Sequence, residues 1–191
     1  VGQPLPGTRI LILDESGQEV ERGDKGEIAV VGPQVMQGYW RASAGRVEPL
    51  EGGLFRSGDI GLIDEDGYIR IVDRAKDMIN VGGFKVFPSQ LEAVLTRHPA
   101  VAEALVIGVE DDRVGERPKA FVVRREEVAA SANDVLAFLN AKVGKHEHVR
   151  ELEFRAALPR TMIGKPDRKA LEAEEKARRG GEGAPKLAAA G

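Results

Sequence analysis

The chain has 191 residues, of which 42% are hydrophobic and 31% charged, with a formal net charge of −3. This apolar content supports one folded domain or two small ones and excludes a wholly disordered protein. The absence of cysteine excludes disulfides and thiolate metal sites, and the near balance of acidic and basic residues gives no electrostatic case for binding nucleic acid. No apolar run approaches the roughly 20 residues of a membrane helix and no signal-peptide pattern opens the chain, so we expect a cytoplasmic protein without a transmembrane segment.

Residues 1–73 are predicted to form short β-strands. Thr8–Asp14 alternates weakly between polar and apolar residues, and Glu27–Val31 is an apolar run between glycines. Asp59–Ile63 and Tyr68–Val72 flank Asp64-Glu65-Asp66-Gly67, whose Asp-Gly pair is a strong signal for a hairpin turn. Several short strands separated by turns indicate a small barrel or sheet.

Beyond Asp73 strands and helices alternate, which indicates an α+β domain of about 100 residues. The boundary between the two halves is expected at Asp73–Asp77. From residue 176 the chain is rich in Ala, Gly, Lys and Glu, and residues 176–191 are predicted to be a disordered tail. The predicted elements of the second half are a turn at Val81-Gly82-Gly83, a helix from Pro88 to near Arg97 with capping-box spacing at Ser89, strands at 104–109 and 119–123, a helix opened by Ser131, a strand at 149–154 and a helix from Pro166.

The segment Leu54–Gly61 places glycines around a single aspartate, Asp59. Glycines let the backbone approach a ligand closely, and the carboxylate can accept two hydroxyl hydrogen bonds. A vicinal diol such as a ribose fits that pair of acceptors. The alternative is a turn aspartate that only precedes a strand.

The charged segment Asp73-Arg74-Ala75-Lys76-Asp77 lies between the two halves. Arg74 has the chemistry to hold a phosphate or a ribose, and Lys76 occupies a position where a hinge is expected. The alternative is a solvated linker. The pair Gly82 and Gly83 indicates, by itself, no more than a turn.

The segment Leu158–Lys165 ends in a glycine followed by a lysine. Gly164 would let the Lys165 ammonium reach a neighbouring cleft and stabilise a developing negative charge there. The segment is not a phosphate-binding P-loop, because the first glycine and the final hydroxyl of that motif are missing. The alternative is a surface lysine that caps a loop. The histidines lack partners at metal-binding spacing, and His146 and His148 are expected in a solvated loop, so no metal site is predicted.

Four segments, in this order, resemble the adenylate-forming superfamily, which includes acyl-CoA synthetases, firefly luciferase and adenylation domains of nonribosomal peptide synthetases. They are Gly26–Tyr39, Phe55–Gly61, Asp66–Ile79 and Pro159–Lys165. The resemblance covers Gly2 to about Leu171. It implies an α+β fold in which residues 1–75 end the large domain, as part of a barrel-like subdomain, and residues 76–175 form a mobile C-terminal lid.

The resemblance also implies the reaction and the residues that serve it. An acid and ATP give an acyl-adenylate and pyrophosphate, and the thiol of CoA then displaces AMP. Asp59 matches the aspartate that binds the ribose hydroxyls, and Arg74 matches the arginine that supports the same nucleotide. Lys165 matches the catalytic lysine, which contacts the acyl carboxylate and the phosphate during adenylation.

The same resemblance assigns the parts that serve CoA. Lys76 matches the hinge about which the small domain swings. Gly82 and Gly83 match the loop that lines the CoA (pantetheine) tunnel after that swing. The implied cofactors are ATP or AMP and Mg²⁺, with CoA as co-substrate. The ATP phosphate loop, most of the Mg²⁺ site and the acyl pocket are absent from this sequence and are expected in a missing N-terminal large domain.

We therefore interpret the sequence as the C-terminal part of an AMP-forming acyl-CoA synthetase, of the medium- or long-chain fatty acid type, that could associate peripherally with a membrane. Two alternatives stay open. One is an adenylating enzyme that loads a carrier protein, and the other is a non-catalytic interaction fragment of the same fold. Because the chain lacks the phosphate loop and the acid pocket, it is predicted to form neither acyl-adenylate nor acyl-CoA by itself.

Overall fold

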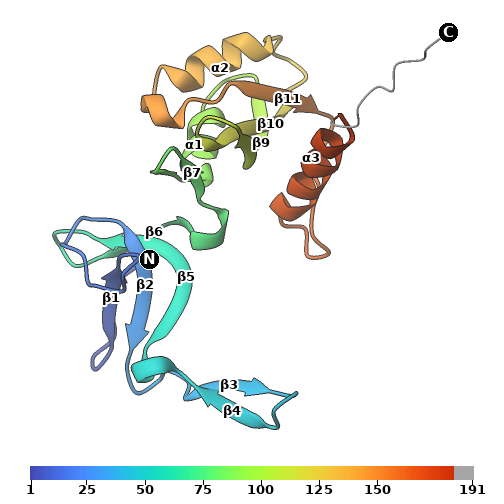
Figure 1. The fold of residues 1–191 in the computed structure, drawn as a ribbon. Helices are drawn as coiled ribbons and strands as arrows, with labels where there is room; N and C mark the ends of the chain where they lie inside the picture. The colour runs from blue at the N-terminus through green and yellow to red at the C-terminus, as the bar shows by residue number, and fades with distance from the viewer. Residues whose placement is uncertain (183–191) are drawn as a thin grey trace. The chain divides into compact units, whose positions relative to one another are not determined.

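The computed structural model describes residues 1–182, and the chain divides into two compact units (Figure 1). The first unit is Val1–Lys76 and the second begins at Asp77. The division thus falls inside the charged segment that the sequence marks as a boundary, one residue beyond the predicted end of the first domain. No helix among residues 1–182 is long and apolar enough to cross a membrane.

The first unit is built on a four-stranded antiparallel sheet with the order β1-β2-β5-β6. Ile12 and Leu13 of β1 and Ile28 and Ala29 of β2 are buried in its core. The sheet is open within this part of the chain, so these strands do not by themselves complete the expected barrel-like subdomain. Its strands are β1 (Arg9–Leu13), β2 (Gly26–Val31), β5 (Phe55–Ile63) and β6 (Ile69–Arg74).

A separate two-stranded ribbon, β3 (Gly38–Arg41) and β4 (Arg46–Pro49), precedes a short 3-10 helix, η1 (Glu51–Gly53). No strands are predicted in this segment from the sequence. Tyr39 and Trp40 are exposed on the ribbon, so its residues lack the alternation of buried and polar positions by which a half-buried strand is recognised.

The second unit contains a five-stranded sheet in which β10 is central. β10 pairs with β9 antiparallel along its whole length and with β11 parallel, and it meets β7 where Gly115 pairs with Val81. The strands are β7 (Ile79–Val81), β8 (Phe84–Val86), β9 (Val101–Asp111), β10 (Gly115–Arg124) and β11 (Glu151–Arg155).

Helices cover both faces of this sheet (Figure 1). Val106 of β9 and Val122 of β10 pack against α1 and α2. Their neighbours in the same strands, Ile107 and Phe121, lie on the opposite face and pack against α3. This alternation follows from the two-residue period of a strand and explains why β9 and β10 are apolar on both faces. The helices are α1 (Pro88–Leu95), α2 (Ala132–Asn140) and α3 (Arg168–Glu182), with a 3-10 turn, η3 (Lys145–Glu147), after α2.

The predicted N-terminal cap is present in α2 but not in α1. Ser131 and Asp134 form a complete capping box at the start of α2. The capping box expected at Ser89 is absent, because the N-cap of α1 is Phe87, which makes no side-chain cap hydrogen bond. Glu92 accepts a hydrogen bond from the backbone N–H of Val106 at 2.8 Å.

Helix α3 extends to Glu182, so residues 176–182 are helical where the sequence predicted a disordered tail. The rest of that predicted tail lies outside the described residues. Helix α3 is tied to the sheet at a lysine buried in β10: Lys119 is 2% exposed, and its Nζ lies 3.0 Å from both carboxylate oxygens of Glu175 on α3. Further ion pairs join the end of α3 to β11, namely Arg178–Glu153 and Arg179–Glu151.

We expect Glu175→Gln to lower the free energy of unfolding of the second unit by up to ~3–5 kcal/mol, because the buried Lys119 would lose its shortest ion pair and keep only Glu153 at 3.5 Å and Glu151 at 3.8 Å. Urea denaturation of the 191-residue chain measures this. Glu174→Gln on the same helix is the matched control, since Glu174 is 58% exposed beside Arg155 and should contribute less than ~1 kcal/mol. Equal losses in the two variants would contradict the role given to the buried pair.

The same pair makes a prediction about pH. Burial raises the pKa of Glu175, but hydrogen bonds from Arg179, Lys119 and Arg178 outweigh it and lower the pKa from 4.5 to about 2. The contribution to stability is therefore complete above the unfolded pKa of 4.5 and is lost as pH falls toward 2. Unfolding free energies measured across this range should fall more steeply for the wild type than for Glu175→Gln.

Candidate functional site

Asp59 and Arg74 lie directly opposite each other on β5 and β6. Arg74 Nε is 2.8 Å from Asp59 Oδ1, and the two side chains are 57% and 24% exposed. The guanidinium orients the carboxylate while leaving it accessible to solvent. Asp59 and Arg74, which were predicted from separate segments to contact a nucleotide, thus form one ion pair.

Hydrogen bonds made by the two residues before Asp59 fix β5 against β2. Ser57 Oγ donates to the carbonyl of Ile28 at 2.8 Å and accepts from the backbone N–H of Asp59 at 3.1 Å. Gly58 has a φ of +73°, which suits glycine, and its N–H donates to a carboxylate oxygen of Glu27 at 3.2 Å. The Ser-Gly-Asp sequence therefore bends β5 against β2 and presents the aspartate at its surface.

Lys76 lies at the end of the first unit, in the 3-10 helix η2 (Ala75–Asp77), and it is exposed. Asp73, two residues before this helix, is 9% exposed and accepts a hydrogen bond from the backbone N–H of Arg74 at 2.8 Å. A chain segment between two compact units is where a rotation would be absorbed. The hinge assignment of Lys76 stays a prediction.

Gly82 and Gly83 form the turn between β7 and β8, with φ values of +59° and +89°. Glycine adopts such conformations without a steric cost. The Gly82 N–H donates to the carbonyl of Val114 at 2.8 Å, and the Gly83 N–H donates to Asn80 Oδ1 at 2.9 Å. The turn is exposed, as access to a ligand requires.

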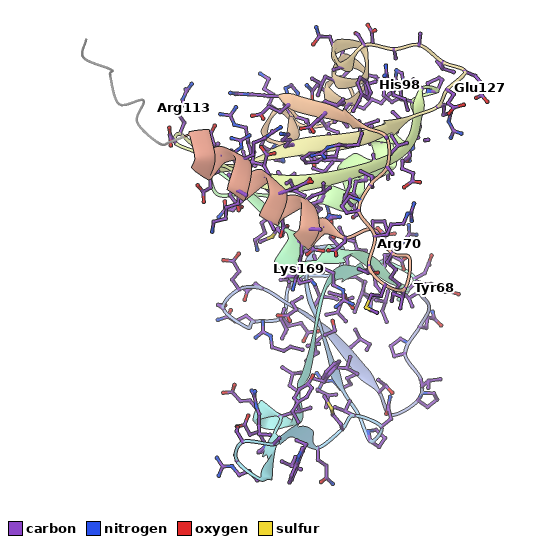
Figure 2. The ribbon with its side chains drawn as sticks, turned by 90° about the vertical axis from the view of Figure 1, so that its right-hand side faces the viewer. Tyr68, Arg70, His98, Arg113, Glu127 and Lys169 are labelled. Carbon is purple, nitrogen blue, oxygen red and sulfur yellow. The ribbon has the colours of Figure 1, made fainter. Side chains whose placement is uncertain are left out.

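A cavity of about 410 Å³ adjoins this turn and is rich in cations. Arg113, labelled in Figure 2, lies in the turn that joins β9 and β10, and Lys145 belongs to η3. The rings of Phe84 and His146 stack with their centres 5.0 Å apart. The lining residues are Val81, Gly82, Phe84, Asp111, Arg113, Val114, Arg117, Pro118, Asn140, Lys145, His146, His148 and Arg150.

The cavity has an excess of positive charge. Its carboxylate, Asp111, is already paired with Arg117. Among residues 1–182, no carboxylate forms an ion pair with Arg113, Lys145 or Arg150. Anionic groups of a ligand would therefore meet three cations that make no ion pair within this part of the chain.

Sequence reasoning missed this cavity and expected His146 and His148 in a solvated loop. Both histidines line the cavity. The available signal was the run Lys145-His146-Glu147-His148-Val149-Arg150, in which four of six side chains are basic or imidazole groups. That run could not be connected with Gly82 or Arg113, because they are far away in the sequence.

Lys165 ends an ordered loop in the second unit. The Thr161 N–H donates to the Lys165 carbonyl at 2.7 Å, and the Lys165 N–H donates to Thr161 Oγ1 at 3.2 Å. Gly164 allows this closure with a φ of +79°. The loop is held to the sheet by Arg160, whose guanidinium is 2.6 Å from Glu103. The Lys165 side chain is exposed on a backbone that is fixed on both sides.

The predicted residues thus form two groups. Asp59 and Arg74 are paired in the first unit, and Lys165 and the Gly82–Gly83 turn belong to the second. The part of the chain that the structure describes holds no group of three or more His, Asp or Glu side chains that could bind a metal ion.

Two family models match the chain. The model of the AMP-binding enzyme family matches residues 1–40, and that of the AMP-binding enzyme C-terminal domain matches residues 90–165. The chain is also 40% identical over 175 residues to a long-chain-fatty-acid–CoA ligase of Yersinia pestis, covering 92% of this chain and 31% of that protein. The chain belongs to the AMP-binding enzyme family.

Solved structures of AMP-binding enzymes agree. The amide bond synthetase McbA from Marinactinospora thermotolerans superposes with a TM-score of 0.80 and 37% identity, covering 91% of this chain and 36% of that one. ATP-bound MatB from Rhodopseudomonas palustris gives a TM-score of 0.82 and 38% identity, with 92% and 35% covered. The resemblance and the α+β class stated from the sequence are confirmed. The chain spans about a third of the length of these relatives.

Proposed function

We propose that this chain serves an AMP-forming acid–thiol ligase of the acyl-CoA synthetase type. In the first half-reaction a carboxylate oxygen attacks the α-phosphate of ATP, forming acyl-adenylate and releasing pyrophosphate. In the second the thiol sulfur attacks the acyl carbon, giving the thioester, AMP and a proton. A large N-terminal domain, corresponding to the remaining length of the relatives, would supply the phosphate loop and the acid pocket. Mg²⁺ would enter with ATP and be held there.

The chain's own groups suit both halves of this reaction. The Asp59 carboxylate, oriented by Arg74, can accept hydrogen bonds from two ribose hydroxyls. The Lys165 ammonium can offset the charge that builds up when a carboxylate approaches a phosphate, provided that water is excluded. A rotation at Lys76 would replace Lys165 by the Gly82–Gly83 turn for the second half. Retention of these groups supports a catalytic part over a non-catalytic fragment.

The cationic cavity beside Gly82 is the observation that favours CoA as the thiol substrate over a carrier protein. CoA bears a diphosphate and a further phosphate on its ribose, whereas a carrier protein presents its phosphopantetheine without that nucleotide. Arg113, Lys145 and Arg150 can bind those phosphates, and the stacked Phe84 and His146 rings offer an aromatic surface. The cavity therefore supports free CoA over a carrier protein. An amine acceptor, as the name of McbA indicates for that relative, is the other outcome to test.

We expect the double variant Arg113→Glu/Lys145→Glu of the enzyme with its large domain to raise KM for CoA by at least ~10-fold, because each charged hydrogen bond contributes about 1.5–3 kcal/mol. Acyl-adenylate formation should be unchanged. Pantetheine, which lacks the nucleotide, is the control substrate and should be used equally well by both proteins. Equal KM values of wild type and variant for CoA would contradict the proposal.

The type of acid is proposed on similarity alone. The Yersinia pestis relative is a long-chain-fatty-acid–CoA ligase, so medium- and long-chain fatty acids are the first substrates to assay. Pyrophosphate release with ATP, Mg²⁺ and a panel of acids measures the preference. The cytoplasmic location and the peripheral membrane association stay predictions.

A further inference from the structure

Glu116, near the start of β10, contacts Asn80 of β7, close to the Gly82–Gly83 turn. Its carboxylate oxygen Oε2 accepts a hydrogen bond from the backbone N–H of Asn80 at 2.8 Å. Asn80 in turn accepts the Gly83 N–H through Oδ1. A chain of hydrogen bonds therefore runs from Glu116 through Asn80 to the tip of the turn.

A second contact reinforces this arrangement from the β9–β10 turn. The Gly82 N–H donates to the carbonyl of Val114, and Val81 pairs with Gly115. A side chain at Gly82 would lie 3.7 Å from Val114, so the two turns pack closely. Gly82, Gly83 and Asn80 are thereby tied to residues 114–116 by backbone and side-chain hydrogen bonds.

The Glu116 carboxylate lies against β9 near Gly108. A Cβ added to Gly108 would lie 3.4 Å from Glu116 Oε1, an ordinary contact, and 3.3 Å from Ile79, a slightly tight one. The carboxylate is therefore close to both Gly108 and Ile79, the residue that begins β7 and precedes Asn80. Glu116 is partly buried there and is not among the residues that line the cavity.

We propose that Glu116 is a positioning residue for the Gly82–Gly83 turn in the thiol half-reaction. The inference rests on the proposed function, in which this turn lines the path of CoA. Two successive glycines with positive φ have much conformational freedom, and a turn that is ordered before CoA arrives loses less entropy on binding. Glu116 acts through Asn80 and touches neither the adenylate nor CoA.

The test is Glu116→Ala in the enzyme with its large domain. We expect KM for CoA in thioester formation from pre-made acyl-adenylate to rise ~10-fold, the effect of losing one hydrogen bond to a charged acceptor. The rate of acyl-adenylate formation should stay within ~2-fold of the wild type. Glu116→Gln keeps an oxygen that can accept from Asn80 and should restore most of the KM. Glu110→Ala is the matched control, because Glu110 pairs with Glu116 across the strands and is exposed.

A readout without catalysis is available in the 191-residue chain. Amide hydrogen exchange followed by NMR should show the Asn80 and Gly83 amides exchanging at least ~10-fold faster in Glu116→Ala, with Val122 in the core of β10 unchanged. Faster exchange throughout β10, together with losses in both half-reactions, would overturn the proposal in favour of a general structural role. Asn80→Ala changes an exposed position and removes the hydrogen bond from the Gly83 N–H to Asn80 Oδ1. This variant should give the same kinetic pattern as Glu116→Ala.

Gly82→Leu separates this inference from the proposed function. If Gly82→Leu raises KM for CoA and Glu116→Ala does not, the turn serves CoA and the role of Glu116 is overturned. If neither variant changes KM for CoA, the turn does not line the CoA path, and both the proposed role of the turn and the inference fall. If KM for CoA rises in both variants while acyl-adenylate formation is unchanged, the result supports both the role of the turn and the role of Glu116.

Discussion

Replacing Lys165 by alanine in the enzyme with its large domain is expected to slow acyl-adenylate formation by ~10²–10³-fold, the usual cost of losing a group that stabilises developing charge. Thioester formation from pre-made acyl-adenylate should stay near the wild-type rate. The anionic carboxylate meets the anionic phosphate only in the first half-reaction, so only that step needs the ammonium. Single-turnover assays of each half-reaction measure the split.

The loop around Lys165 makes this variant informative. Its backbone is held by the hydrogen bonds between Thr161 and Lys165 and by the Arg160–Glu103 ion pair, none of which involves the ammonium. Lys165→Ala therefore removes a charge without removing the contacts that order the loop. Lys169→Ala, at an exposed lysine of α3 labelled in Figure 2, is the control and should leave both rates unchanged. Equal losses in the two half-reactions would remove Lys165 from the adenylation step.

Lys76→Pro is expected to act in the opposite way, with adenylation intact and thiol transfer reduced at least ~10²-fold, the scale of loss when reacting groups are misplaced by about 1 Å. Lys76 lies in a 3-10 helix, whose φ values of about −50° to −70° suit the proline ring. The variant should therefore keep the conformation seen here while resisting a rotation of φ at position 76.

Lys76→Ala is the control for this experiment, because it removes the same side chain but leaves the backbone free to rotate. We expect it to support both half-reactions. Rapid mixing of pre-made acyl-adenylate with CoA isolates the second step. Normal overall turnover by Lys76→Pro would show that position 76 is not the hinge, and impaired turnover by Lys76→Ala would assign the effect to the ammonium.

Features encoded by neighbouring residues could be predicted from the sequence. The Asp64–Gly67 turn joins β5 and β6 as expected, and Ser131 caps α2 through Asp134, three residues away. The Asp59–Arg74 pair lies close to the same predicted hairpin, because Asp59 begins its first strand and Arg74 follows the predicted end of its second strand, Val72, by two residues; the sequence placed Arg74 in the segment between the two halves. Short-range turn and cap chemistry depends on local backbone conformation, which the residues involved largely determine themselves.

Features that depend on distant residues were decided only by the tertiary structure. Lys119 lies in an apolar strand, and nothing nearby in the sequence indicates that its partner is Glu175 of α3, a helix that continues into residues predicted to be disordered. The cationic cavity likewise combines Gly82, Arg113 and Lys145 from three separate segments. A buried charge needs a counter-charge, but which one it meets depends on how the helix packs on the sheet. The local sequence can therefore nominate single residues for a site, whereas the packing of strands and helices determines which of them share a cavity.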